Sequence, residues 1–211
     1  MRAVIITGGM IDDYNYYKNY FNEDDIVICA DGGVKHLINL DLDASYFLGD
    51  FDSCNFEDVK NDSHLKNAQI IKFNSEKDET DTEIALNLAL EKGVSNIVIL
   101  GAIGTRIDHT LANIMLMKKA LKHNVELKIV NEKNEIRLVD KSISLNPVKN
   151  AFLSVIALKT TTNLTLKNVK YELNEFTLST DTSLGISNEF TDKKAIISFD
   201  EGLLLVIISR D

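Results

Sequence analysis

The chain has 211 residues, of which 45% are hydrophobic and 26% are charged, and this composition is typical of a globular protein. Its net charge is −9 and it lacks a basic stripe, so the sequence predicts no nucleic-acid partner. The apolar runs fall short of the roughly 20 residues of a membrane span, no signal peptide is recognisable, and the two cysteines, Cys29 and Cys54, have no CxxC spacing. We therefore expect a cytoplasmic protein without a membrane partner.

Short β-branched runs alternate with longer helical patterns in the first part of the chain. The runs predicted as strands are Ala3–Thr7, Ile26–Ala30, Gln69–Phe73, Ile97–Leu100 and Glu126–Val130. This alternation predicts a parallel sheet with helices on its faces.

Two segments between these runs have clear helical signals. Thr80–Lys92 opens with a capping box, in which Glu83 follows Thr80 by three positions, and it stops at Gly93. Asp108–His123 carries a broad apolar stripe and ends in basic residues, which suit the C-terminus of a helix.

Beyond Val130 the runs become short and β-rich, and no helix is predicted. The expected strands are Phe152–Leu158, Thr162–Leu166, Thr177–Ser179, Lys194–Phe199 and Leu203–Ser209. We therefore predict an α/β catalytic domain with a parallel sheet in residues 1–139, followed by a smaller all-β sandwich domain in residues 140–211.

Two glycine pairs come directly after the first two predicted strands. They are Gly8-Gly9 and Gly32-Gly33, the second preceded by Asp31. Ligands of open parallel sheets bind at the carboxyl ends of the strands, and glycine lets a backbone approach a ligand closely. A tight turn explains either pair alone, and the chain contains neither a GxGxxG fingerprint nor a GxxxxGK[ST] phosphate loop.

The segment Gly49-Asp50-Phe51-Asp52-Ser53 follows an apolar run and presents two carboxylates two positions apart. In an extended segment these side chains point the same way, and two like charges repel unless a cation lies between them. Mg²⁺ prefers such oxygen ligands. The alternative interpretation is a solvated turn.

Two further segments precede the predicted helices. Glu76, Asp78, Glu79 and Asp81 crowd around the capping residue Thr80; acids at a helix N-terminus explain part of this cluster, and a bound cation would explain the rest. Gly101–His109 places glycines and Arg106 at a strand-to-helix turn, which suits phosphate. The alternative is an Asp108 N-cap with Arg106 on the surface.

Together these segments resemble the thiamine pyrophosphokinase family, in order and over nearly the whole chain. The matching segments are Asp31-Gly32-Gly33, Gly49–Ser53, Asp78–Asp81, Gly104–His109 and Ser187-Asn188-Glu189-Phe190. The resemblance implies an α/β catalytic domain followed by a β-sandwich, a homodimer, and thiamine held at the subunit interface. One departure is Thr105, where many relatives have a second glycine before the arginine.

The resemblance also implies a role for individual side chains. Asp50, Asp52 and Asp81 would hold Mg²⁺ on the ATP phosphates. As a separate mechanistic hypothesis, Asp81 or Asp78 accepts the hydroxyl proton, so these four are the candidate catalytic residues. The residues implied to surround ATP are Gly8, Gly9, Asp31, Gly32, Gly33, Arg106, Asp108, His109 and Asn113. Ser187 and Asn188 would hold thiamine.

The expected reaction is transfer of the diphosphate group of ATP to the hydroxyl of thiamine, giving thiamine diphosphate and AMP. Three alternatives fit parts of the pattern: a pyrophosphokinase acting on another alcohol such as a hydroxymethyl pterin, a nucleotide-sugar transferase with an Asp-x-Asp metal motif, and a non-catalytic sensor of thiamine or nucleotide. The crowded carboxylates argue against the sensor.

Overall fold

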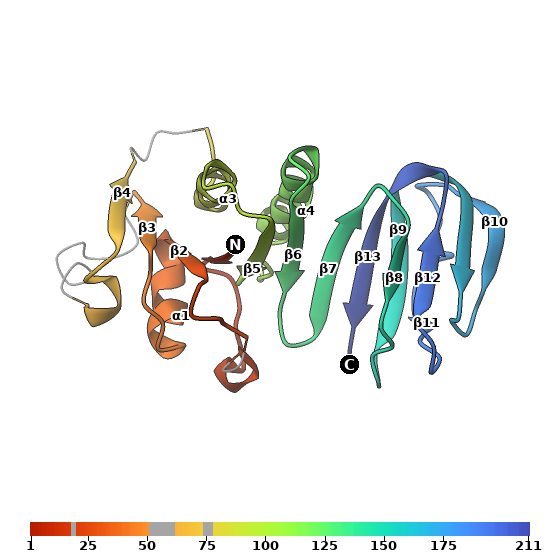
Figure 1. Ribbon diagram of the computed structural model, residues 1–211, viewed down its shortest axis with the longest axis horizontal. Helices are drawn as coiled ribbons and strands as arrows, with labels where there is room; N and C mark the ends of the chain where they lie inside the picture. Colours follow the sequence, from red (N-terminus) through yellow and green to blue (C-terminus); the bar gives the residue numbers. More distant parts are fainter. Residues whose placement is uncertain (18–19, 51–61, 74–77) are drawn as a thin grey trace. The chain divides into compact units, whose positions relative to one another are not determined.

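The computed structural model describes residues 1–17, 20–50, 62–73 and 78–211. The chain divides into two compact units, Met1–Glu132 and Lys133–Asp211 (Figure 1). Among the residues described, no helix combines the length and the apolar character that a membrane-spanning segment requires.

The first unit is built on a parallel sheet with the strand order β4-β3-β2-β1-β5-β6. These strands are β1 (Arg2–Ile6), β2 (Ile26–Ala30), β3 (Tyr46–Gly49), β4 (Gln69–Lys72), β5 (Asn96–Leu100) and β6 (Glu126–Val130). The prediction of a parallel sheet is confirmed. The sequence does not predict β3, because its four residues form only a short apolar run before Asp50.

Helices connect the strands. The α-helices are α1 (Val34–Asn39), α3 (Asp81–Glu91) and α4 (Ile107–Lys122), and short 3-10 helices are η1 (Tyr14–Tyr17), η2 (Asp31–Gly33) and η3 (Ser63–Leu65). The Thr80 hydroxyl accepts a hydrogen bond of 3.2 Å from the Glu83 N–H, which starts α3 where the capping box predicted. The chain leaves α3 through Gly93, whose positive φ of 68° suits a glycine.

Both faces of this sheet are buried. Val4, Val27 and Phe47 belong to a core cluster that includes Leu37 of α1. Side chains alternate along a strand, so the positions between them face the other side, where α3 and α4 contact the sheet. This explains why the central strands read as continuous apolar runs.

The order of the strands places a switch point at β1. The chain runs from β1 through β2 and β3 to β4 on one side, and then returns to add β5 and β6 on the other side of β1 (Figure 1). The connection after β1 leads to one side of the sheet and the connection after β5 leads to the other. A crevice therefore opens between the carboxyl ends of these two neighbouring strands. This is the region in which the sequence predicted ligand binding.

The second unit contains strands only, in the order β7-β13-β9-β12-β8, with β10 and β11 also paired to β9. They are β7 (Asn134–Val139), β8 (Ile143–Leu145), β9 (Phe152–Lys167), β10 (Leu173–Leu178), β11 (Asn188–Glu189), β12 (Ala195–Ser198) and β13 (Glu201–Ser209). The expected all-β architecture is confirmed. Since β7 pairs with β13, it belongs to this unit, whereas the predicted domain boundary lay at 139/140.

One long strand replaces two that the sequence predicted separately. β9 has 16 residues, and its first half pairs with β11 and β13, while its second half pairs with β10 and β12. The pairing with β13 shifts register near Thr162, and Asn163 has a positive φ of 53°. This irregularity lies where the two predicted strands were separated, so the break is a bend in a continuous strand.

An ion pair fixes the start of β1 to the turn before β2. The Arg2 Nε donates a hydrogen bond of 2.9 Å to Asp25, and the guanidinium also donates one of 2.7 Å to the Tyr20 carbonyl. Burial alone would raise the pKa of Asp25, but the hydrogen bonds from Arg2 and Asn22 outweigh it and lower that pKa. The carboxylate therefore stabilises the fold only while it is ionised.

Arg2→Met should lower the free energy of unfolding at pH 7 by about 1–3 kcal/mol, because the largely buried Asp25 loses its charged donor. Folding lowers the pKa of Asp25, so its carboxylate stabilises the fold at pH values above the usual pKa of aspartate and loses this effect as it becomes protonated. The difference in unfolding free energy between wild type and variant should therefore shrink below about pH 4. Urea unfolding across this range tests the prediction, with Lys66→Met on the surface as the control. A deficit that does not depend on pH would contradict it.

Candidate active site

A cavity lies at the switch point of the first unit, and we call it the strand-end cavity. Its volume is ≈ 340 Å³. It is lined by the ends of β1, β2 and β5 and by the first residues of α3 and α4: Thr7, Gly8, Gly9, Ala30, Gly32, Thr80, Asp81, Thr82, Gly101, Ala102, Gly104, Thr105, Arg106, His109 and Asn113.

Glycines allow the strand ends around this cavity to approach one another. A Cβ on Gly9 would lie 2.1 Å from the Gly101 carbonyl oxygen, and a Cβ on Gly8 would lie 3.1 Å from the backbone of Gly32. The two predicted glycine pairs thus meet at one place. Gly33 does not line the cavity: its missing Cβ would lie 2.3 Å from the Ile6 carbonyl, so it permits close packing of η2 on β1.

The N-termini of α3 and α4 both open at the strand-end cavity. The first N–H groups of a helix lack partners inside the helix and carry partial positive charge. Arg106 is the N-cap residue of α4, and its side chain accepts no capping hydrogen bond from the N–H groups of the first turn. This arrangement favours an anion in the cavity.

Arg106 and Asp108 form an exposed ion pair at the start of α4. The guanidinium donates hydrogen bonds of 3.2 and 2.6 Å to the carboxylate, and both side chains are more than half exposed. The bond from Arg106, followed by that from the His109 N–H, lowers the pKa of Asp108 to about 2. Because exposed pairs are weakly held, Arg106 can exchange this partner for a phosphate, whereas Asp108 does not line the cavity.

Asn113 supports the cavity from α4. Its side chain is buried, and its amide donates a hydrogen bond of 2.8 Å to the Ala102 carbonyl. It therefore holds the loop after β5 against the helix, while His109, one turn earlier, is exposed at the cavity.

Among the predicted acidic residues that the structure describes, Asp31, Asp50 and Asp81 follow β2, β3 and Thr80 at the same edge of the sheet, in different surroundings. Asp81 lines the strand-end cavity. Asp31 is buried, and its side chain lies against Gly49, which immediately precedes Asp50. Asp78 is exposed and does not line the cavity.

The predicted metal site is only partly covered by the structure. Asp52 lies outside the described residues, and among those described no group of three or more His, Cys, Asp or Glu side chains is placed to hold a metal ion. The residues present nevertheless suit Mg²⁺ with a phosphate, because the donors at this edge are carboxylate oxygens and the neighbouring glycine-lined space accepts an anion.

In the second unit, Ser187 and Asn188 have different surroundings. Ser187 is exposed and has a positive φ of 56°, an uncommon conformation for serine. Asn188 is buried, and its amide group donates a hydrogen bond of 2.7 Å to the Tyr171 carbonyl and accepts one of 3.0 Å from the Tyr171 N–H. Asn188 thus fixes the segment before β10, and only Ser187 offers its side chain to a ligand.

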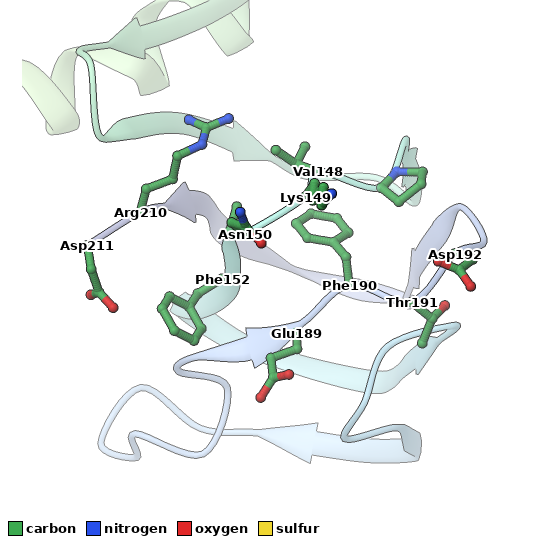
Figure 2. Close-up of a pocket in the computed structure, with 12 residues that line it drawn as sticks. Val148, Lys149, Asn150, Phe152, Glu189, Phe190, Thr191, Asp192, Arg210 and Asp211 are labelled. Carbon is green, nitrogen blue, oxygen red and sulfur yellow. The ribbon is translucent and has the colours of Figure 1, made fainter.

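A second cavity, with a volume of ≈ 1090 Å³, lies in the second unit (Figure 2). Phe152 and Phe190 contribute aromatic rings to it, and Arg210 lies near the C-terminus of the chain. No helix N-terminus opens into it, and Ser187 and Asn188 are not among the residues that line it. Its greater volume therefore does not make it the site of phosphate chemistry.

Several lining residues were not among the predicted site residues. Some of them lie within the motifs described above, so their place in those motifs could have identified them as site residues: Thr7, Thr80, Gly101, Gly104 and Thr105. Ala30 and Thr82 carried no signal. They contribute small side chains that leave room for a ligand.

Glycine-lined strand ends and two helix N-termini at a switch point define the first unit as an α/β domain whose cavity suits a phosphate ester. Two family models match the chain: the thiamin pyrophosphokinase catalytic domain over residues 17–129, and the thiamin pyrophosphokinase vitamin B1 binding domain over residues 138–204.

Individual relatives agree with these models. The chain is 30% identical to thiamine pyrophosphokinase of Bacillus subtilis, over 98% of each sequence. The crystal structure of thiamine pyrophosphokinase from B. subtilis is similar with a TM-score of 0.90 at 29% identity, covering 100% of both chains. The structure of thiamin pyrophosphokinase from Geobacillus thermodenitrificans has a TM-score of 0.87 at 29% identity, covering 100% of this chain and 98% of that one.

The chain therefore belongs to the thiamin pyrophosphokinase family, and it is an enzyme that forms thiamine diphosphate by pyrophosphoryl transfer. The resemblance found in the sequence is confirmed, and these matches favour it over the three alternative interpretations.

Gly9→Ala should destabilise the protein by at least about 2 kcal/mol, because the new methyl group overlaps the Gly101 carbonyl oxygen. Gly104→Ala is the matched control, since its Cβ would make ordinary contact at 3.5 Å with the Gly9 Cα, and it should change stability by less than about 1 kcal/mol. Chemical unfolding of both variants tests this. Equal stability of the two would show that the loops do not meet as described.

Proposed function

We propose that this enzyme takes its diphosphate group from ATP, requires Mg²⁺, and releases AMP with thiamine diphosphate. The single observation that carries the proposal is that two helix N-termini, Gly8-Gly9 and Asp81 surround one cavity. This combination provides neutralising groups for a phosphate chain together with a carboxylate for a cation.

The phosphates of ATP would lie in the strand-end cavity. The starts of α3 and α4 line the cavity and would place their partial positive charge near the anion, and Arg106 would add a planar fork of donors when it releases Asp108. Gly32 and His109 complete the wall around the nucleotide. Of the other residues proposed for ATP, Asp31 and Gly33 shape the end of β2, and Asn113 supports the loop after β5.

Asp50, Asp52 and Asp81 would hold the magnesium ion. When bound, Mg²⁺ neutralises the phosphate oxygens and the charge that develops on the leaving group. The carboxylate oxygens of these residues would provide hard ligands, and these acidic groups would also favour the cationic thiazolium ring of thiamine near the phosphates.

The reaction requires that the thiamine hydroxyl and the phosphate chain meet in line. The hydroxyl oxygen attacks the β-phosphorus, a new P–O bond forms, and the bond to the oxygen of the α-phosphate breaks so that AMP leaves. Asp81 or Asp78 would accept the hydroxyl proton. We favour Asp81, because it lines the cavity whereas Asp78 does not.

Ser187 and Asn188 would act together on thiamine, with the exposed Ser187 hydroxyl in contact with it and the buried Asn188 amide holding the neighbouring backbone.

We also propose that the enzyme is a cytoplasmic homodimer with thiamine at the subunit interface. The match of residues 138–204 to a vitamin B1 binding domain supports thiamine, rather than a pterin, as the acceptor.

Asp50→Asn and Asp81→Asn should each reduce AMP formation from ATP, Mg²⁺ and thiamine by at least about 100-fold while leaving the protein folded, because each removes a charge from the proposed metal site. The measurement is the joint appearance of AMP and thiamine diphosphate, with circular dichroism as the check on folding. Asp24→Asn, at an exposed aspartate of the same unit, should keep full activity. Near-normal turnover in both site variants would reject these metal roles, and activity of the wild type in excess chelator would reject the Mg²⁺ requirement.

Ser187→Gly and Ser187→Ala should both raise the KM for thiamine by about 3- to 10-fold, since both remove the hydroxyl. They should differ in stability: glycine adopts the left-handed conformation freely and should raise the free energy of unfolding by about 1 kcal/mol relative to alanine. Steady-state kinetics and urea unfolding measure the two effects. An unchanged KM in both variants would remove Ser187 from the thiamine site.

A further inference from the structure

His36 is a buried histidine of α1 that lies behind the glycine loop and does not line the strand-end cavity. Its Nε2 lies 2.8 Å from the Gly9 carbonyl oxygen, and its Nδ1 lies 2.8 Å from the Tyr14 hydroxyl. A carbonyl oxygen can only accept a hydrogen bond, so Nε2 carries the hydrogen. Burial lowers the pKa of His36, which favours the neutral ring, and its Nδ1 then accepts from Tyr14.

Gly9 is held on both sides by hydrogen bonds. Its N–H donates a bond of 2.8 Å to the Gly101 carbonyl, and its carbonyl accepts the bond from His36. The next residue, Met10, donates a bond of 2.8 Å to the Ile103 carbonyl. The loop after β1 is thus fixed between the loop after β5 on one side and α1 on the other.

The histidine bond matters because the residues it holds are glycines. Gly8 and Gly9 have no side chains that packing could fix, and glycine has access to more backbone conformations than any other residue. If the donor were lost, the half-buried Gly9 carbonyl would turn toward another partner or toward water, because its hydrogen bond to His36 would no longer hold it in place. That rotation would move the peptide that forms the wall of the strand-end cavity.

We propose that His36 is a positioning residue for the nucleotide: by donating to the Gly9 carbonyl, it sets the conformation of the glycine loop that receives the phosphates. The inference rests on the proposed binding of ATP in the strand-end cavity. His36 itself does not touch the nucleotide and acts only through Gly9.

Tyr14 and Asn39 extend this arrangement toward the surface. The Tyr14 hydroxyl fixes the orientation of the imidazole, and the Asn39 amide donates a longer hydrogen bond of 3.4 Å to the Tyr14 oxygen and one of 2.7 Å to the Lys35 carbonyl. Tyr14 therefore selects the ring orientation in which Nε2 points at Gly9. The residues of this network, Tyr14, His36 and Asn39, come from η1 and α1.

The test compares His36→Gln with His36→Asn. The amide nitrogen of glutamine can reach the position of Nε2 and donate to Gly9, whereas the shorter asparagine reaches only the position of Nδ1. Calorimetric binding of ATP with Mg²⁺ should be within about 2-fold of wild type for the glutamine variant and about 3- to 10-fold weaker for the asparagine variant. The KM for ATP should follow the same order, with the KM for thiamine unchanged.

Arg2→Met serves as the control for lost stability, because it breaks a partly buried ion pair at the opposite end of β1 and should leave ATP affinity unchanged. If His36→Asn does not fold, Tyr14→Phe carries the test. It keeps the imidazole and should weaken ATP binding by about 2- to 3-fold. Equal ATP affinity in the glutamine and asparagine variants, or an unchanged affinity in Tyr14→Phe where that variant carries the test, would overturn the inference.

Arg106→Ala distinguishes this failure from failure of the proposed function. If Arg106→Ala weakens ATP binding and His36→Asn does not, the role of His36 is wrong and the nucleotide site stands. If neither variant weakens it, ATP does not bind in the strand-end cavity, and both proposals fail.

Discussion

The site depends on the close approach of three strand ends, which only glycine permits. Gly8 lies against Gly32, and Gly9 lies against the Gly101 carbonyl, so the loops after β1, β2 and β5 meet without intervening side chains. A methyl group on Gly9 would overlap a carbonyl oxygen. This backbone wall, rather than a set of long basic side chains, is where we propose that the phosphate chain binds in this acidic protein.

The topology of the sheet also explains why several of the predicted acidic residues follow strands at this one edge. In parallel strands the carboxyl ends lie at one edge, so the residues that follow β2 and β3 become neighbours although they are distant in sequence. Asp31 lies against Gly49, and Asp50 follows directly. The N-terminus of α3 brings Asp81 to the cavity, where the helix also contributes partial positive charge.

Much of the fold could be predicted from local signals. The capping box of Thr80 and Glu83 places the start of α3 correctly, and the β-branched runs place β2 and β6 at their observed bounds. The four-residue β3 and six-residue α1 were missed, because segments so short do not complete a recognisable period. The sequence divides β9 in two because the polar residues 159–161 interrupt its apolar pattern, at the point where the pairing with β13 shifts register.

The site was predictable where it lies in motifs and hidden where it depends on tertiary contacts. Gly8, Gly9, Asp81 and Arg106 stand in segments whose composition already indicated phosphate and metal chemistry. The structural use of Asn188 was not visible, because its bonds to Tyr171 join separate segments. His36 carried no signal either, since a histidine near a glycine pair shows its role only when its hydrogen-bond partners are known.

A crystal structure of the enzyme with Mg²⁺ and a non-hydrolysable ATP analogue tests the central claim most directly. We predict the phosphate chain in the strand-end cavity, against Gly8-Gly9 and the starts of α3 and α4, with the metal ion between Asp50, Asp52 and Asp81. A nucleotide bound elsewhere, for example in the cavity beside Phe152 and Phe190, or a metal ion without these carboxylates, would contradict it.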